Sequence, residues 1–135
     1  SSDTEEMKKI PRSLPALLRS EKIQAKARRA GFDWDDVGEA FLKVREELLE
    51  LEEACEQQDK AHMRHELGDL LFAVVNVARF LDIDPEEALN LTSARFIRRF
   101  SLVEAQASDI GRSLKEMSLA EMDELWEIAK SKEQL

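Results

Sequence analysis

The sequence contains little of what disulfide bridges, tight turns and membrane spans require. Its 135 residues include one cysteine, four glycines and three prolines. A single cysteine, Cys55, excludes an internal disulfide and agrees with a reducing, cytoplasmic setting. The scarcity of glycine and proline predicts few, long elements. No apolar run approaches the roughly 20 residues of a membrane span, and no stretch resembles a signal peptide.

The charge balance limits the classes of partner. A net charge of −9 argues against a nucleic-acid backbone as the main partner, but not against a small anionic substrate bridged by cations. Hydrophobic residues make up 43% and charged residues 36%, which excludes disorder and is typical of a helical protein with a solvated outer face. Because the chain begins Ser1-Ser2-Asp3 without a methionine, a processed product and the last domain of a longer protein both remain open.

The periodicity predicts an all-α bundle of about five helices around a four-helix core. We expect a flexible leader over residues 1–12, one domain over 13–131 and a tail over 132–135. Ser13 is the expected N-cap of the first helix and Asp84 that of the fourth, while Ser118 and Glu121 form a capping box for the last. The first four expected helices span about residues 14–30, 36–58, 60–81 and 85–107.

The third of these helices carries two acids in its first half and is almost entirely apolar after them. From Leu70 to Leu81 the only polar side chains are Asn76 and Arg79, so the helix is expected to be buried in a bundle or against a second copy. Its first turns carry Glu66 and Asp69, which share one face at i and i+3.

A second acidic pair, Glu47 and Glu50, lies on the preceding helix beside an apolar stripe that includes Cys55, which we expect in the core. The connection between the two helices is short, so they are expected to be antiparallel neighbours. The distances of Glu50 and Glu66 from the turn are similar, and the two acidic pairs are therefore expected to face each other.

A set of metal ligands made only of carboxylates favours a hard cation such as Mg²⁺ or Mn²⁺. Such a cation commonly binds a phosphate-bearing substrate. Arg95 and Arg99, one turn apart on the fourth helix, are placed to hold phosphates. The alternatives are solvated acidic and basic faces. His62 and His65 match neither a zinc-protease nor a di-iron helix motif, so we expect them at the surface.

Several stretches together resemble a known family. Glu46-Glu47-Leu48-Leu49-Glu50 followed by Glu66-Leu67-Gly68-Asp69 has the form EExxE…ExxD. With LPALLRSEKIQAKARRAGFDW, ELGDLLFAVVNVARFL and RFIRRF, the chain is similar over about residues 12–130 to the C-terminal catalytic domain of bacterial MazG. These proteins are nucleoside triphosphate pyrophosphohydrolases of the all-α NTP pyrophosphatase superfamily.

The resemblance implies Mg²⁺-dependent hydrolysis of canonical or aberrant nucleoside triphosphates to the monophosphate and pyrophosphate, as house-cleaning or pool regulation. Mn²⁺ is a substitute, and the family's members are helical homodimers, often intertwined. The resemblance assigns the metal to Glu47, Glu50, Glu66 and Asp69, with Glu46 just outside the ligand set, phosphate contacts to Arg95, Arg99 and Lys43, and a base contact to Trp126.

The chain departs from the family pattern at one place. Where relatives usually have Lys-x-Asn-x-Lys before the Phe, this chain has Leu91-Thr92-Ser93-Ala94-Arg95. Arginine can replace the last lysine as a phosphate contact, whereas Leu91 cannot replace the first. Two alternatives therefore stay open: a catalytically silent nucleotide-binding or dimerisation module, and a dUTP- or dCTP-specific pyrophosphatase of the same superfamily.

Overall fold

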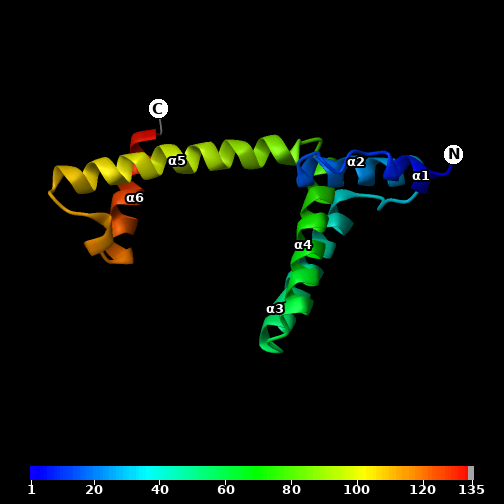
Figure 1. Cartoon of the computed structure of the whole chain (residues 1–135), viewed down its shortest axis with the longest axis horizontal. Coiled ribbons are helices and arrows are strands. Elements are labelled where there is room, and N and C mark those ends of the chain that lie inside the picture. The colour runs from blue at the N-terminus through cyan, green and yellow to red at the C-terminus, as the bar shows by residue number, and fades with distance from the viewer. Residues whose placement is uncertain (134–135) are drawn as a thin grey trace. The chain divides into compact units, whose positions relative to one another are not determined.

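A computed structural model describes residues 1–133 and consists of helices joined by short connections (Figure 1). Among the described residues there is no strand, so the all-α prediction is confirmed. Six α-helices and one short 3-10 helix are present in this part of the chain, where about five helices were expected. They are α1 (Asp3–Lys8), α2 (Ala16–Arg29), α3 (Val37–Glu56), α4 (Lys60–Phe80), α5 (Pro85–Asp109), η1 (Leu114–Glu116) and α6 (Leu119–Glu133).

The additional helix is α1, in a stretch that was expected to be an irregular leader. The Ser2 hydroxyl accepts a hydrogen bond from the Glu5 amide at 3.1 Å and thereby caps it. Helix α1 packs against α2, and Ile10, just after its end, is buried. The sequence pattern missed this helix because it is one polar turn and a half, too short to show an apolar period.

Aspartates begin the helices that matter most for the acidic residues. Asp36 accepts from the Glu39 amide at 3.0 Å at the start of α3, and Asp59 accepts from the His62 amide at 3.2 Å at the start of α4. The expected caps of α5 and α6 are confirmed by bonds to Asp84 and by the reciprocal pair Ser118–Glu121. The expected Ser13 cap of α2 is wrong, because Pro15 occupies that position without a side-chain bond.

The chain divides into two compact units, residues 1–88 and the residues from Leu89 onward, with the boundary inside α5. In the first, small buried residues of α3 and α4 let the two helices pack side by side as an antiparallel hairpin, as expected from the short connection (Figure 1). The buried apolar residues of the first unit are Ile10, Ala40, Ala54, Ala73, Val75 and Val77, and those of the second are Val103, Ala107, Met117 and Ala129.

Many large apolar side chains of the hairpin stay exposed. On α3 the buried residues are Ala40, Glu47 and Ala54, so the expected inward stripe is turned partly to solvent. Cys55 lies on this stripe and is exposed, so the prediction that it belongs to the core is wrong. On α4, Leu67, Leu71 and Val74 are each about half exposed. Within the described residues, no helix is both long and apolar enough for a membrane crossing.

The Asp36 cap yields a stability prediction. Asp36→Ala removes the acceptor for an amide at the start of α3, so we expect a loss of about 1 kcal/mol in the free energy of unfolding, measured by urea denaturation. Asp35→Ala is the matched control, because it removes a neighbouring carboxylate for which no hydrogen bond is found in the described part of the chain. Equal losses from the two variants would contradict the capping role.

Candidate functional site

Three acidic side chains meet where α3 and α4 pack together. Glu47 and Glu66 are only 4% and 6% exposed, unusual values for carboxylates. One oxygen each from Glu47, Glu50 and Glu66 lies within 4.8 Å of the others. The hairpin therefore brings together three of the four acids that the sequence pattern selected, two from α3 and one from α4.

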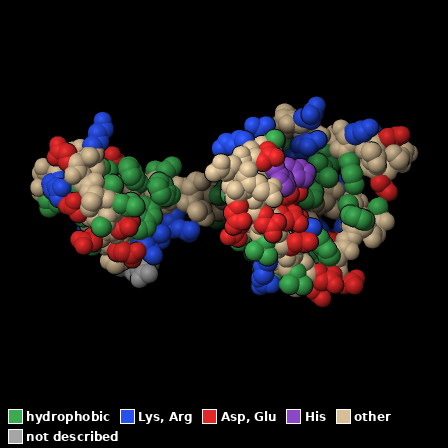
Figure 2. Space-filling model, turned by 90° about the horizontal axis from the view of Figure 1, so that it is seen from below, with side chains coloured by type: hydrophobic (Ala, Val, Ile, Leu, Met, Phe, Trp, Pro, Cys, Tyr) green, Lys and Arg blue, Asp and Glu red, His purple; other side chains and the backbone are tan. Residues whose placement is uncertain are grey.

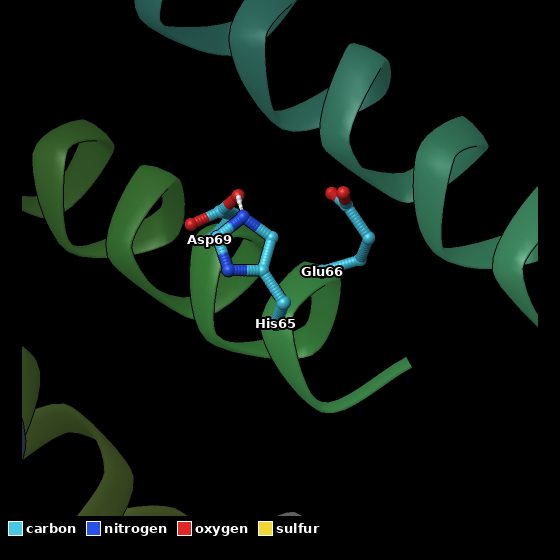
Figure 3. A group of neighbouring side chains, drawn as sticks. All are labelled: His65, Glu66 and Asp69. Carbon is cyan, nitrogen blue, oxygen red and sulfur yellow. Dashed lines mark ion pairs between the residues drawn. The ribbon is translucent and has the colours of Figure 1, made fainter. Parts of the chain in front are cut away.

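The fourth acid, Asp69, belongs to a second group that shares Glu66. Ligand atoms of His65, Glu66 and Asp69 also lie within 4.8 Å of one another. Figure 3 shows His65 beside Asp69, an ion pair of 3.1 Å, and Glu66 pointing from α4 toward the neighbouring helix. The four acids consequently form one continuous cluster through Glu66.

Both histidines contact this cluster. His62 Nε2 lies 3.2 Å from Glu66 Oε1, and His65 Nε2 lies 3.1 Å from Asp69 Oδ2. The expectation of surface histidines fits the largely exposed His65, but it overlooked these contacts. The signal was available in the i,i+4 spacing of each His and its acid. Figure 2 shows acidic side chains (red) gathered next to the histidines (purple).

Lys43 is the cation of the cluster on α3. Its Nζ atom lies 2.9 Å from Glu47 and 3.1 Å from Glu46. The hydrogen bond from Lys43 holds the pKa of Glu47 below its usual range. The neighbouring Glu47 and Glu66 raise the pKa of Glu50 to about 7, because a third negative charge is unfavourable there. Glu46 contacts Lys43 and lies outside both groups of acids.

The cluster fits a hard cation. Glu47 Oε2 and Glu66 Oε2 are buried and have no hydrogen-bond partner among the described residues. A buried, unpaired carboxylate oxygen is costly, whereas a divalent cation of the Mg²⁺ type takes several such oxygens. The donor set is dominated by oxygen, which favours Mg²⁺ or Mn²⁺ over the softer transition metals.

A cleft of about 630 Å³ adjoins the acids and falls within the size range of small-molecule sites. Glu47, Asp69 and Lys43 line it together with aromatic and amide side chains from α2, the α2–α3 connection and α4. Trp34 is half-buried in this lining. The remaining lining residues are Ile23, Gln24, Ala27, Gly31, Phe32, Asp33, Phe72, Ala73, Asn76 and Arg79.

An ion pair crosses the cleft lining. Arg79 donates to the two carboxylate oxygens of Asp33 at 2.9 and 2.7 Å, and to Asn76 Oδ1 at 2.8 Å. The bidentate bond to Arg79 lowers the pKa of Asp33 below its ordinary value of 3.8. Both side chains are largely buried, so the pair fixes the α2–α3 connection against α4.

The remaining residues that the resemblance selected lie in the second unit. Arg99 pairs with Glu133 at 2.7 Å and lies over the Trp126 ring at 5.9 Å, while Trp126 packs against Phe96. Arg95 is exposed, with a long contact of 3.4 Å to Thr92. The structure brings Arg99 and Trp126 together, whereas their contacts to phosphate or base stay predictions.

Residues 40–103 match the family model described as the MazG nucleotide pyrophosphohydrolase domain. The chain is 42% identical over 117 residues to the "Nucleoside triphosphate pyrophosphohydrolase/pyrophosphatase MazG" of Thermotoga maritima, covering 87% of this chain and 45% of that protein. It is also 42% identical over 126 residues to the "Nucleoside triphosphate pyrophosphohydrolase" of Escherichia coli K12, covering 92% and 48%.

A third relative is the "Uncharacterized protein YabN" of Bacillus subtilis, 45% identical over 134 residues, with 98% of this chain and 27% of that protein covered. The chain thus spans about half the length, or less, of these curated relatives. All four candidate acids lie inside the segment that matches the family model.

The Asp33–Arg79 pair predicts a pH-dependent loss of stability. Because the folded-state pKa of Asp33 is lowered, its stabilising contribution is complete above about pH 3.8 and disappears as the pH falls through the folded-state value. Asp33→Asn leaves Arg79 without its buried partner, so we expect it to cost about 3 kcal/mol at neutral pH.

The measurement is urea unfolding of both proteins from neutral to acid pH. The difference between wild type and Asp33→Asn should shrink below about pH 3.8, as the wild-type carboxyl is itself protonated. Asp35→Asn, at an exposed neighbour, should show almost no difference at any pH. A cost for Asp33→Asn that does not change with pH would contradict this assignment.

Proposed function

We propose that this chain, which carries a domain of the MazG nucleotide pyrophosphohydrolase family, cleaves nucleoside triphosphates to the monophosphate and pyrophosphate. The observation that carries the proposal is the pair of unpartnered, buried carboxylate oxygens on Glu47 and Glu66, because Glu47 lines a cleft of about 630 Å³ and Glu66 lies beside it in the acidic cluster. A cation site joined to a space of this size suits a nucleotide better than a small metabolite.

In the proposed enzyme Glu47, Glu50, Glu66 and Asp69 hold Mg²⁺, for which Mn²⁺ is a substitute. The bound cation supplies neutralisation of phosphate oxygens and activation of a water nucleophile. The acids themselves have a further consequence. In a chain of net charge −9, a cluster of carboxylates repels a triphosphate, so substrate binding depends on the cation being present.

Lys43 is proposed to act in two ways. Its contact keeps Glu47 ionised and therefore ready for a cation. Lys43 also lines the cleft. A cation at Glu47 would weaken the ion pair between Glu47 and Lys43, so that the ammonium group becomes available to a phosphate oxygen. The family resemblance likewise implies a phosphate contact for Lys43.

Arg95, Arg99 and Trp126 remain the proposed contacts of the second unit with the substrate. The side chain of Arg95 is exposed, and Thr92 is its one hydrogen-bond partner among residues 1–133, so a phosphate can approach it directly. Arg99 is held by Glu133, and a phosphate would compete with that carboxylate. Trp126, half-buried under Arg99, offers an aromatic surface on which a base can stack.

Turnover of a panel of ribo- and deoxyribonucleoside triphosphates with Mg²⁺ tests the activity. We expect pyrophosphate and monophosphate in equal amounts, and loss of the reaction when a chelator removes the cation. If the folded protein releases no pyrophosphate from any of these triphosphates, with Mg²⁺ or Mn²⁺, the activity is rejected. The silent nucleotide-binding module is then the remaining alternative. Turnover confined to dUTP or dCTP would identify the pyrimidine specialist.

The same assay distinguishes the acids. Glu66→Gln keeps the shape of the side chain and removes its charge, so we expect at least about a 100-fold loss of turnover with an unchanged helical circular dichroism spectrum. Glu52→Gln removes an exposed acid from α3 outside the cluster and should retain wild-type turnover. Equal rates for the two variants would remove Glu66 from the site.

A second copy of the chain is the proposed cover for the exposed apolar face of α4. Leu67, Leu71 and Val74 form this face, and each is about half exposed in the described unit. Apolar patches of this kind on a folded unit mark contact surfaces. Homodimerisation would bury them and add to a core in which small residues predominate.

Sedimentation over a range of protein concentrations measures this association. We expect a dimer for the wild type and a shift toward monomer for Leu71→Asp, because a charge at the contact would be buried without a partner. Lys60→Asp, at the exposed and polar start of the same helix, introduces the same side chain and should remain dimeric. A monomeric wild type at all concentrations would exclude the dimer.

A further inference from the structure

The two buried carboxylates of the acidic cluster are held in the same way on the two helices of the hairpin. On α3, Lys43 Nζ lies 2.9 Å from Glu47 Oε1, and on α4, His62 Nε2 lies 3.2 Å from Glu66 Oε1. Each basic residue precedes its acid by four positions, so it reaches the acid across one helical turn. In both acids the second oxygen, Oε2, is buried and has no hydrogen-bond partner among the described residues. Each acid thus has one oxygen held by its own helix and one oxygen left without a partner.

The bond between His62 and Glu66 has a defined direction. A carboxylate that binds a cation is ionised, and an ionised carboxylate can only accept hydrogen bonds. The Nε2 atom of His62 must therefore donate to Glu66 Oε1. The backbone of His62 is also fixed, because its amide donates to the Asp59 side chain at the start of α4. One particular nitrogen of the imidazole is consequently directed at Glu66.

Glu66 depends on this bond more than an exposed acid would. Its side chain is 8% exposed, so water is poorly placed to replace a lost hydrogen bond to the carboxylate. Carboxylates that bind a metal are commonly hydrogen-bonded by neighbouring side chains, which fix their orientation. Without the bond from His62, the carboxylate of Glu66 would be free to turn away from the acids of α3.

The other histidine forms a similar pair that lacks the burial. His65 also precedes its acid, Asp69, by four positions, but the two side chains are 70% and 43% exposed. Figure 3 shows this pair beside Glu66, whose carboxylate points away from it toward the neighbouring helix. An exposed ion pair contributes little, because water competes for both groups. Of the two histidines, His62 is therefore the one whose contact can orient a buried acid of the cluster.

We propose that His62 is a positioning residue of the cation site, which holds Glu66 Oε1 so that Oε2 is presented to a cation shared with Glu47 and Glu50. The inference rests on the proposed function for the presence of the cation. His62 acts through Glu66 and touches neither the cation nor the substrate. Each helix of the hairpin then carries one basic side chain that orients a buried acid, Lys43 on α3 and His62 on α4.

Two amide substitutions test which atom makes the bond. The side-chain nitrogen of glutamine can take the place of Nε2 in histidine, whereas that of asparagine takes the place of Nδ1 and falls short of Glu66. His62→Gln should therefore keep the wild-type affinity for Mn²⁺ within about twofold, and His62→Asn should bind Mn²⁺ about tenfold more weakly. Both variants are polar and neutral, which suits the half-buried position of His62 in the first turn of α4.

Titration of Mn²⁺ into the metal-free protein, followed by the electron paramagnetic resonance signal of the free ion, measures this affinity without substrate. Arg64→Gln and Arg64→Asn are the matched controls, because Arg64 is exposed two residues further along α4. They contain the same difference in helix propensity, and we expect equal Mn²⁺ affinities from them. Equal affinities for His62→Gln and His62→Asn, in proteins with the same helical circular dichroism spectrum, would overturn the positioning role.

Turnover separates positioning from direct contact with the substrate. In His62→Asn the Mg²⁺ concentration that gives half-maximal turnover should rise about tenfold, while the KM for the triphosphate at saturating Mg²⁺ should stay within about twofold of the wild-type value. His62→Gln should restore the wild-type requirement for Mg²⁺. A higher KM for the triphosphate with an unchanged requirement for Mg²⁺ would make His62 a substrate contact and reject the inference.

The role of His62 and the proposed activity fail separately. If the Mn²⁺ affinities differ as expected in a protein that hydrolyses no triphosphate, the role of His62 is retained and the activity is rejected. If triphosphates are hydrolysed and the wild type, His62→Gln and His62→Asn all bind Mn²⁺ equally, the activity is retained and the role of His62 is rejected.

Discussion

Carboxylates that face one another inside a helical hairpin are the constraint on which the rest of the first unit depends. Glu47 on α3 and Glu66 on α4 are almost fully buried, and Glu50 completes a group whose oxygens lie within 4.8 Å of one another. Charges of one sign at this distance repel strongly where water is excluded. The protein reduces the repulsion with Lys43 and with the protonation that a Glu50 pKa of about 7 permits. Each of these reduces the repulsion only in part, whereas a divalent cation bound among the carboxylates would offset it further.

The packing around these acids explains how the hairpin can hold them. The apolar residues that α3 and α4 bury are small, three alanines and two valines, which lets the helices approach closely enough for acids on both to meet. The consequence is a thin core, in which Val75 is the one large side chain that is almost wholly inaccessible in the described part. Large apolar residues are left on the outer faces of the same helices. The geometry that favours the acidic cluster therefore also leaves exposed the apolar face on which the proposed dimer would form.

Local pattern was sufficient for the part of the site that lies on helix faces. The i,i+3 spacing of Glu47 with Glu50 and of Glu66 with Asp69, together with the short connection, predicted the pairs that the hairpin brings together. It was insufficient for contacts between distant segments. Asp33 and Arg79 are 46 residues apart, and nothing in the period of either segment indicates that they meet. The exposure of Cys55 has a similar cause, because the apolar stripe of α3 is wider than the face that α4 covers.

Arg79 and Asn76 were visible in the sequence only as the polar exceptions in an otherwise apolar helix. Stability alone gives no reason to retain them, since replacing a buried ion pair by well-packed apolar residues is often neutral or favourable. An apolar pair, however, could not fix the orientation of the Asn76 amide. The Asp33–Arg79 pair does so, because a guanidinium with both its branches bound to a carboxylate has a defined direction for its next donor. Orientation of the amide, rather than stability, is thus the property that this ion pair alone provides.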